Sequence, residues 1–300
     1  VAAEEEAASL ALARRLQEEE DAAMQASGSA QQQRSQLRLD AAEFSASIGR
    51  QPQRPKLTNK TIREAVQAFC DEGGGKERAD FLHSPNAAAK YGPVSAWDVS
   101  GVTDMKGLFE EMEAFNVPIG DWQVEQVTDM TFMFRGALRF NQPIGDWKVD
   151  RVKRMRRMFW HAEAFNQPLG EWQVDQVNDM HEMFYEAHAF NQPIGQWSVH
   201  NVTDMSSMFA HTKAFNQPIG EWRVEQVTHL FNMFANASAF DQPIGEWQVG
   251  QVTRMNSMFW SATSFNQPIG QWHVDKVTDM GNMFRNAAAF NQPIGEWKVD

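Results

Sequence analysis

The chain has 300 residues, of which 42% are hydrophobic and 11% aromatic, so it can build a substantial core in one or two domains. Its formal net charge of -12 argues against a general binder of nucleic acid or of anionic membranes. The single cysteine, Cys70, excludes an intrachain disulfide and a thiolate metal site, and it fits a reducing compartment.

Residues 1–26 are predicted to form an isolated charged helix, because EEEAASLALARRLQEEEDAAM holds strong helix formers and neither glycine nor proline. Within it, LALARRLQEEEDA at 10–22 resembles an inverted ubiquitin-interacting motif. The resemblance implies that Ala13 meets the hydrophobic patch of ubiquitin, flanked by Leu12 and Leu16. The residues that would face ubiquitin's basic rim are Glu18, Glu19 and Glu20. A solvated helix or a coiled-coil fragment is the alternative.

Two different segments follow this helix. Residues 27–56 are polar and contain glycine and proline, as in GSAQQQRSQ and GRQPQRP, which predicts a flexible linker. Residues 57–92 are predicted to form a capping segment, because a repeat array needs a cover over the apolar end of its first unit. One helix face in this segment is predicted to hold Ile62, Val66, Phe69 and Cys70, and three glycines at 73–75 end the helix.

Residues 93–300 repeat with a period of 25 residues. Tryptophan recurs at this interval from Trp97 to Trp297, and the phrase FNQPIGEW appears eight times with small changes. The unit reads I-G-x-W-x-V-x-x-V-T-D-M-x-x-M-F-x-x-A-x-x-F-N-Q-P. A period of this length indicates a solenoid or propeller-like array, and 25 residues are too few for a four-stranded blade.

The spacing inside the unit predicts an α/β solenoid. Trp122 and Val124 alternate with polar Gln123, which predicts a short strand. Thr128 is expected to cap a following short helix, and Gly145 to permit a tight bend. The apolar residues that predict the helix, at i, i+3, i+4 and i+7, are Met130, Met133, Phe134 and Ala137.

The repeat also carries a family resemblance, in the text W-x-V-x-x-V-T-D-M-x-x-M-F-x-x-A-x-x-F-N-Q. It resembles the repeat of bacterial surface proteins and mycoplasma lipoproteins described as BspA-like, which is related to leucine-rich repeats. The segment TIREAVQAFC…AAAKYGPVSAWDVSGVTDM looks like the usual start of that family. The resemblance covers residues 57–300 and implies a leucine-rich-repeat-like solenoid, a surface or interaction module without assigned catalysis.

The departures from the repeat are the candidate binding residues. DRVKRMRRMFWHAEAF at 150–165 gathers basic residues in an acidic chain, and an aromatic residue follows them where other coils carry alanine, arginine or glutamate. Exposed aromatic side chains beside arginine are typical of binding hot spots. The predicted protein-partner site comprises Arg156, Arg157, Trp160, Tyr185 and Trp260. A solvated face with aromatic gap-filling is the alternative.

The other repeated polar residues are predicted to be structural. The asparagine column from Asn116 to Asn291 is expected to stabilise turns rather than to bind a ligand. The aspartates equivalent to Asp104 are expected to cap helices rather than to bind calcium. The eight histidines are scattered, and neither H-x-x-x-H nor G-x-S-x-G occurs. We therefore predict no enzyme, no cofactor and no metal site.

These observations predict a non-enzymatic protein-interaction scaffold, which becomes a ubiquitin-linked adaptor if the N-terminal helix binds ubiquitin. The alternative is a cell-surface adhesin or structural spacer, and a third is the targeting region of an enzyme whose catalytic domain lies elsewhere. We predict no nucleic-acid partner, and no run of about 18 apolar residues indicates a membrane span. Because the chain begins at Val1 and stops within a repeat at Asp300, we expect a longer protein. An intracellular location is favoured over the cell surface.

Overall fold

The computed structural model of the chain describes residues 56–73, 75–76 and 84–298. Every described residue belongs to one compact unit, Arg54–Asp300. The predicted helix at 1–26 therefore lies outside the described residues, as does all of the predicted linker except Lys56.

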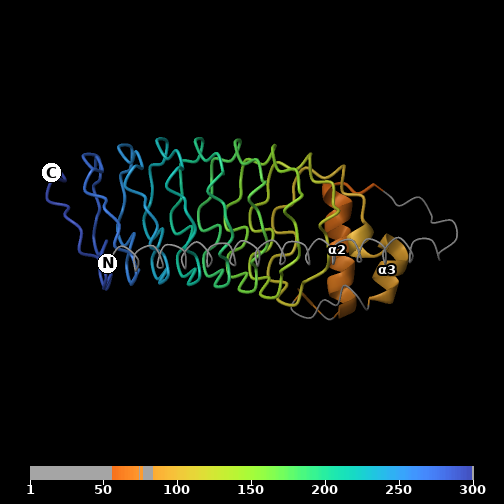
Figure 1. Cartoon of the computed structure of the whole chain (residues 1–300). Coiled ribbons are helices and arrows are strands. Elements are labelled where there is room, and N and C mark those ends of the chain that lie inside the picture. The colour runs from red at the N-terminus through yellow and green to blue at the C-terminus, as the bar shows by residue number, and fades with distance from the viewer. Residues whose placement is uncertain (1–55, 74, 77–83, 299–300) are drawn as a thin grey trace, which may run out of the picture. The chain divides into compact units, whose positions relative to one another are not determined.

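This unit begins with two α-helices and one turn of 3-10 helix. They are α2 (Asn59–Gly73), α3 (Pro85–Tyr91) and η2 (Val94–Ala96). Helix α2 lies across the first coil of the array (Figure 1) and buries Ile62, Ala65, Val66, Phe69 and Cys70.

The contact between α2 and the array is made by side chains and by backbone. The ring of Phe69 lies 5.9 Å from that of Trp97, centroid to centroid. The Asn59 Oδ1 atom accepts a hydrogen bond from the Thr103 backbone N–H at 2.8 Å. Helix α2 thus covers the apolar end of the first coil and satisfies polar groups at its edge.

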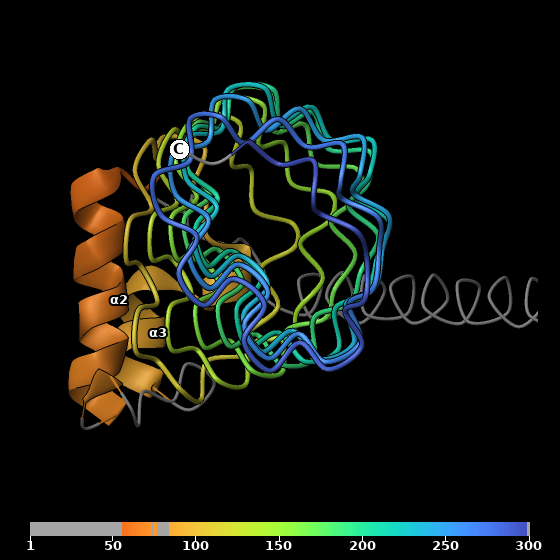
Figure 2. The same ribbon diagram turned by 90° about the vertical axis from the view of Figure 1, so that its left-hand side faces the viewer.

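From Trp97 onward the chain winds into successive 25-residue coils that lie in register, as the end-on view shows (Figure 2). Backbone hydrogen bonds join each coil to the next, for example Met130 N–H to the Arg154 carbonyl at 3.0 Å. A column of isolated parallel bridges links residues 25 apart, from Asp104–Asp129 to Arg254–Asp279. Each coil therefore offers its neighbours the backbone partners that a lone coil would lack.

The segment predicted to be helical in each coil is a series of turns instead. Its hydrogen bonds run from i+3 to i, as from Met133 N–H to the Met130 carbonyl at 3.1 Å. Phe132 and Gly136 have positive φ angles of 60° and 70°, which interrupt a right-handed helix every four residues. The N–H groups between these bonds donate to carbonyl groups of the next coil. The apolar spacing that predicts a helix therefore also fits a stack of such turns. No strand occurs among the described residues; the predicted Trp–x–Val strand is likewise absent.

Two framework residues act differently from the predictions. Thr128 does not cap a helix; its hydroxyl donates to the Thr103 carbonyl of the preceding coil at 3.2 Å. Gly145 is needed for close approach rather than for a special backbone angle, because a Cβ there would lie 2.6 Å from the Pro168 carbonyl oxygen. Both residues therefore serve the contact between neighbouring coils.

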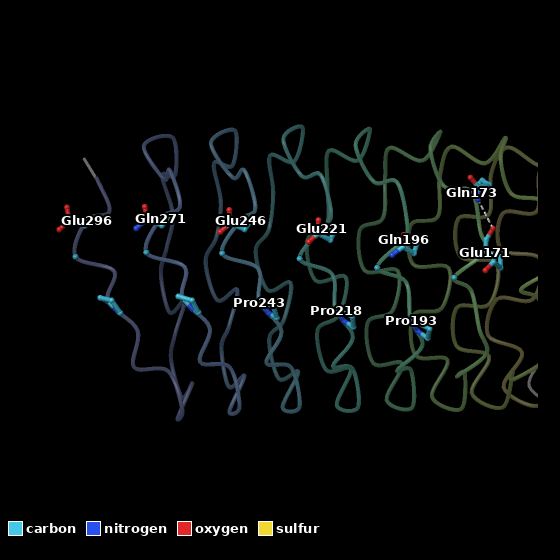
Figure 3. Close-up of a pocket in the computed structure, with 18 residues that line it drawn as sticks. Glu171, Gln173, Pro193, Gln196, Pro218, Glu221, Pro243, Glu246, Gln271 and Glu296 are labelled. Carbon is cyan, nitrogen blue, oxygen red and sulfur yellow. Dashed lines mark hydrogen bonds between the residues drawn. The ribbon is translucent and has the colours of Figure 1, made fainter. Parts of the chain in front are cut away.

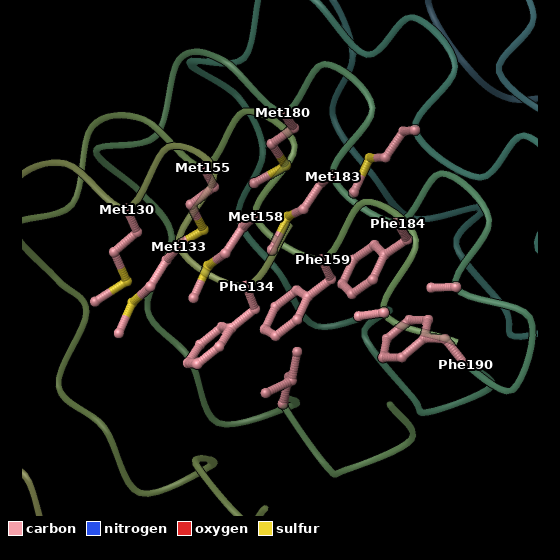
Figure 4. Close-up of a cluster of buried hydrophobic side chains, with 14 of the residues drawn as sticks. Met130, Met133, Phe134, Met155, Met158, Phe159, Met180, Met183, Phe184 and Phe190 are labelled. Atoms are coloured by element: carbon pink, nitrogen blue, oxygen red, sulfur yellow. The ribbon is translucent and has the colours of Figure 1, made fainter. Parts of the chain in front are cut away.

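The centre of the coils is filled by ladders of identical side chains (Figure 4). Met133 and Phe134 are fully buried, as are their equivalents in the next coils. Phe134 stacks on Phe140 of its own coil at 3.9 Å and on Phe159 of the next coil at 5.6 Å, centroid to centroid. The Trp147 Nε1–H donates to the Ile119 carbonyl at 3.1 Å, so the only polar atom of the indole has a partner.

Candidate interaction face

One surface of the array carries residues that change from coil to coil and includes the predicted partner residues. In the coil that begins at Trp122 these are residues 129, 131, 132, 135 and 136, and their equivalents follow at intervals of 25. We call this surface the variable face. Its backbone includes the column of parallel bridges, and its described side chains lie outside the continuous apolar core. Stacking of the framework therefore leaves the residue types on this face free to vary.

The predicted residues Trp160 and Tyr185 lie side by side on the variable face. Their rings are parallel within 6° and 5.7 Å apart, and both side chains are half-buried. The Arg135 guanidinium lies over the Trp160 ring at 5.2 Å from its centroid, and His211 lies 5.2 Å from Tyr185 on the other side. The two aromatic rings thus form the middle of a ladder that ends in a cation–π contact.

Two arginines of the basic cluster around Arg156 are paired with carboxylates of neighbouring coils. Arg157 forms an ion pair with Glu182, and Arg154 lies 2.9 Å from a carboxylate oxygen of Asp129. The half-buried Arg156 side chain forms no ion pair or hydrogen bond with the rest of the described chain. Of the two predicted arginines, Arg156 is therefore the one whose guanidinium remains available to a partner.

A charged cluster next to this ladder is centred on the buried His181. Its Nε2 lies 3.4 Å from Glu182 and its Nδ1 lies 3.6 Å from Asp204. Burial lowers the pKa of His181, but the two carboxylates outweigh this effect and raise the pKa to about 9. Burial likewise opposes ionisation of Glu182, but His181 and Arg157 hold the pKa of that carboxyl at about 2. The cluster is therefore fully ionised at neutral pH and ties three successive coils together.

The third predicted aromatic residue, Trp260, stands apart from the other two. Within the described part of the chain it is the only large hydrophobic side chain in the exposed class, with 38% of its surface accessible. The same column carries Ala210 and Ala235 between Tyr185 and Trp260, so the aromatic ladder is interrupted for two coils. The structure thus divides the predicted partner site into a stacked pair and a separate exposed tryptophan.

The asparagine and aspartate columns are occupied by backbone contacts. Asn141 Oδ1 accepts the Asn166 backbone N–H at 2.9 Å and the Gln167 Nε2 at 3.0 Å. Asp129 Oδ1 accepts the Thr131 backbone N–H at 2.9 Å, which stabilises a turn rather than a helix end. Among the residues that the structure describes, no group of three or more His, Cys, Asp or Glu side chains is placed to hold a metal ion.

Two residues of this face were missed by the sequence analysis as contributors to the site. Arg135 stands one period before Trp160, and His181 stands one period after Arg156. Alignment of the coils by their 25-residue period would have placed Arg135 beside Trp160 and His181 beside Arg156, because residues 25 apart are adjacent in space. The residues predicted to bind ubiquitin lie outside the described part of the chain; they are Leu12, Ala13, Leu16, Glu18, Glu19 and Glu20.

Comparison with known proteins gives one match. A family model described as a Mycoplasma protein of unknown function, DUF285, matches residues 81–194 and, in a second overlapping segment, residues 168–260. No curated protein and no solved structure matches the chain. No helix in the described residues is long and apolar enough to cross a membrane.

Proposed function

The chain belongs to the family described as Mycoplasma protein of unknown function, DUF285, and from this premise we propose that it is a non-enzymatic protein-interaction scaffold. The array is a leucine-rich-repeat-like solenoid in this proposal, and the variable face is where it holds a protein partner. The two matched segments share residues that lie in the region of the 25-residue repeats. This overlap is consistent with a repeat protein rather than with a single catalytic domain.

The observation that carries this proposal is the contrast between framework and variable face. The indole N–H groups and the asparagine side chains are satisfied by adjacent coils, so they need no external ligand. Trp260, by contrast, is partly exposed where two other coils carry alanine. Large aromatic side chains and arginine dominate the energetics of protein interfaces, which favours Trp260 and the Arg156–Trp160–Tyr185 group as partner contacts.

The experiment is a comparison of two triple variants in partner capture from a lysate of the source organism. Trp160→Ala, Tyr185→Ala and Trp260→Ala together remove the aromatic contacts, whereas Gln123→Ala, Gln176→Ala and Gln248→Ala change exposed side chains outside the variable face. A partner lost from the first variant and kept by the second supports the proposal. The same partners on both variants would exclude the variable face as the site.

A ubiquitin-linked adaptor is the finer form of this proposal. It rests on the LALARRLQEEEDA sequence at 10–22, and it requires that ubiquitin bind the predicted helix. Titration of a peptide of residues 1–30 into isotopically labelled ubiquitin tests it directly. Chemical-shift changes around the hydrophobic patch of ubiquitin support the adaptor, and a spectrum unchanged at about 1 mM peptide would eliminate it.

A structural spacer is the second candidate function, and the near identity of the framework columns favours it. A spacer needs length and rigidity, and it needs no particular residue at the variable positions. It predicts that the triple aromatic variant behaves like the wild type in every binding assay, whereas the scaffold predicts loss of a partner.

A further inference from the structure

The coils around Trp260 form a part of the variable face with a composition of its own. Ala235, Trp260 and Arg285 follow one another in one column, and the residues three before and one after each of them flank this column. The flanking residues are all asparagine or serine, namely Asn232, Asn236, Ser257, Ser261, Asn282 and Asn286. We call these six residues together with Trp260 the amide region. Earlier coils carry charged residues at the same positions, among them Arg157 and Glu186.

These positions adjoin one another in space. In an earlier coil the Arg135 guanidinium lies 5.7 Å from the ring centroid of Phe132, which stands three residues before it. The Trp260 carbonyl accepts the Asn236 N–H at 2.7 Å, and the Trp260 N–H donates to the Ser257 carbonyl at 3.0 Å. The amide region is therefore one continuous surface around the indole.

Backbone conformation does not explain this composition. All six flanking residues have positive φ angles, between 55° and 60°, and asparagine adopts such angles more readily than most residues. Arg157 and Glu182 nevertheless have φ angles of 53° and 54° at equivalent positions. The conformation therefore tolerates charged side chains, and their absence from the amide region needs another reason.

The side chains of the amide region are not used by the framework. Those of Asn232, Ser257 and Asn282 form no hydrogen bond within the described part of the chain. The other three flanking side chains take part only in contacts of 3.4 and 3.5 Å, at the long limit for a hydrogen bond. The framework residue Asn141, in contrast, accepts at 2.9 Å from the next coil. The carboxamides and hydroxyls of the amide region thus remain available to a ligand.

The indole of Trp260 is as free as these side chains. Arg135 covers one face of the Trp160 ring and Tyr185 covers the other. Among the described residues, no aromatic ring stacks on Trp260 and no cation lies over it. Coils precede and follow Trp260, so its exposure is not an effect of the end of the array.

From the exposed indole and its frame of uncharged polar groups we infer that the amide region binds a neutral saccharide carried by the protein partner. A pyranose ring has a face of C–H groups, which packs on the electron-rich face of an indole. Its rim of hydroxyl groups donates and accepts hydrogen bonds, as asparagine carboxamides and serine hydroxyls do. Charged side chains would lose hydration against such a ligand and find no opposite charge in it, so their absence suits a neutral saccharide.

The amide region is close enough to the proposed protein site to meet the same partner. Trp160 and Tyr185 are one coil apart with ring centroids separated by 5.7 Å, so the three coils from Tyr185 to Trp260 span about 17 Å. An interface of about 800 Å² per partner covers both places. The inference rests on the proposed function in this respect, because the polypeptide of the partner contacts the Arg156–Trp160–Tyr185 group while its glycan reaches the amide region.

The test is saturation-transfer NMR on the whole chain with four neutral probes, maltotetraose, cellotetraose, mannotetraose and chitotetraose. We expect at least one of them to bind at about 10 mM or below, and Trp260→Ala to weaken that binding by roughly tenfold or more. Asn232→Ala with Asn282→Ala should weaken it by about fivefold, because two carboxamides are lost. The matched control, Gln196→Ala with Gln271→Ala, removes two exposed carboxamides from a separate groove of ≈ 1010 Å³ (Figure 3). It should weaken binding by less than about twofold.

A second arm identifies the source of the saccharide. The probe that binds best, added in excess to a lysate of the source organism, should reduce capture of the partner by the wild-type chain. Undiminished capture would mean that the saccharide is a free ligand, which would overturn its assignment to the partner. If the triple aromatic variant loses a partner but no probe binds to the wild type, the proposed function stands and this inference alone falls.

Three results of the NMR experiment would overturn the inference. They are absence of binding by all four probes at about 10 mM, equal weakening by the asparagine and glutamine variants, and tighter binding of a hyaluronan tetrasaccharide, which carries carboxylates. The last result would assign the region to an acidic saccharide held by Arg285, because Arg254 already lies over the Phe231 ring at 5.0 Å. Trp160→Ala with Tyr185→Ala should leave binding of the free probes unchanged, which separates this site from the rest of the variable face.

Discussion

Gly220 shows at the scale of one residue how closely the coils approach. A Cβ atom at this position would lie 2.4 Å from the Pro243 carbonyl oxygen, a backbone atom that cannot move without shifting the next coil. Gly250, in contrast, has open space around the position of a Cβ. The glycine two residues before the tryptophan of each coil from Trp122 to Trp272 is thus required for stacking. Gly250 occupies a position outside the variable face whose residue type also changes from coil to coil.

Gly220→Ala should therefore destabilise the array, by about 1–3 kcal/mol as for other overpacked sites. The measurement is the midpoint of thermal unfolding, with Gly250→Ala as the control variant. The control should unfold at or slightly above the wild-type temperature, because alanine restricts the unfolded chain more than glycine does. Equal midpoints for the two variants would show that the coils can separate at residue 220 without loss of stability.

His181 gives the array a pH dependence with a definite sign. Its pKa is raised to about 9 from an ordinary value of 6.5, because Asp204 and Glu182 outweigh the effect of burial. The stabilisation is therefore complete below pH 6.5 and is lost as the pH rises to about 9. The pKa values of Glu182 and Asp204 are lowered to about 2, so their contribution is lost only as the pH falls through that value.

We expect the wild type to lose about 3 kcal/mol of stability through this residue between pH 6 and pH 10, and His181→Gln to lose none of it. Urea unfolding at the two pH values measures the difference. His273→Gln, which changes an exposed histidine, should keep the wild-type pH dependence. If His181→Gln loses the same stability between pH 6 and pH 10 as the wild type, His181 is not the group whose deprotonation destabilises the protein.

At the scale of the element, the coil illustrates what sequence pattern can and cannot predict. The period, the stacking and the buried side chains followed from the spacing of Trp, Met and Phe. The helix did not form, because i, i+3, i+4 and i+7 spacing fits any chain that turns every few residues, and the positive φ angles at Phe132 and its equivalents are not written in residue type. Of those equivalents only Gly107, Asn232 and Asn282 are residues that favour this conformation.

The candidate site was predictable to the same extent. Trp160, Tyr185 and Trp260 were recognisable as departures from the repeat, but their grouping depends on distance along the array. Trp160 and Tyr185 are adjacent because they are one period apart, whereas Trp260 is three periods further on. The pairing of Arg157 with Glu182 was not predicted, because it depends on the contact between residues one period apart, and Arg157 was expected to face a partner.

The side-chain oxygens of the asparagine column accept hydrogen bonds from the next coil. Asn191 Oδ1 accepts the Asn216 backbone N–H at 2.9 Å and the Gln217 Nε2 at 3.0 Å. Asn191→Ala should cost about 1–3 kcal/mol, because it leaves the Asn216 N–H without a partner, whereas Gln217 Nε2 keeps the Asn191 backbone carbonyl at 3.1 Å. Asn191→Asp retains the acceptor, as Asp241 does in a later coil, and should be far milder. If urea unfolding shows an equal loss of stability in both variants, the column has a role other than accepting hydrogen bonds.

Helix α2 is the element that covers the first coil. Phe69→Ala should destabilise the protein by about 3–5 kcal/mol, as other buried phenylalanines do, and should increase hydrogen exchange in residues 97–112 more than in later coils. Glu64→Ala, on the exposed face of the same helix, is the control and should change neither quantity. Unchanged exchange at 97–112 in Phe69→Ala would show that the first coil is stable without its cover.

At the scale of the whole molecule, the array separates two tasks among its columns. The polar groups of the framework columns are satisfied by the adjacent coil, and we propose that the variable face selects a protein partner. In a repeat array each unit contacts only its neighbours, so a change on the variable face should have little effect on distant coils. Binding and stability are therefore expected to be separable in this chain by the choice of column.

Site-specific photo-crosslinking tests this separation most directly. A crosslinking amino acid is placed at Trp260 on the variable face or at Gln123 outside it, and the protein is exposed to a lysate of its source organism. We expect position 260 to capture a defined partner that position 123 does not, and Trp160→Ala with Tyr185→Ala to reduce the yield at 260. Capture of the same proteins from both positions, or from position 123 alone, would contradict it.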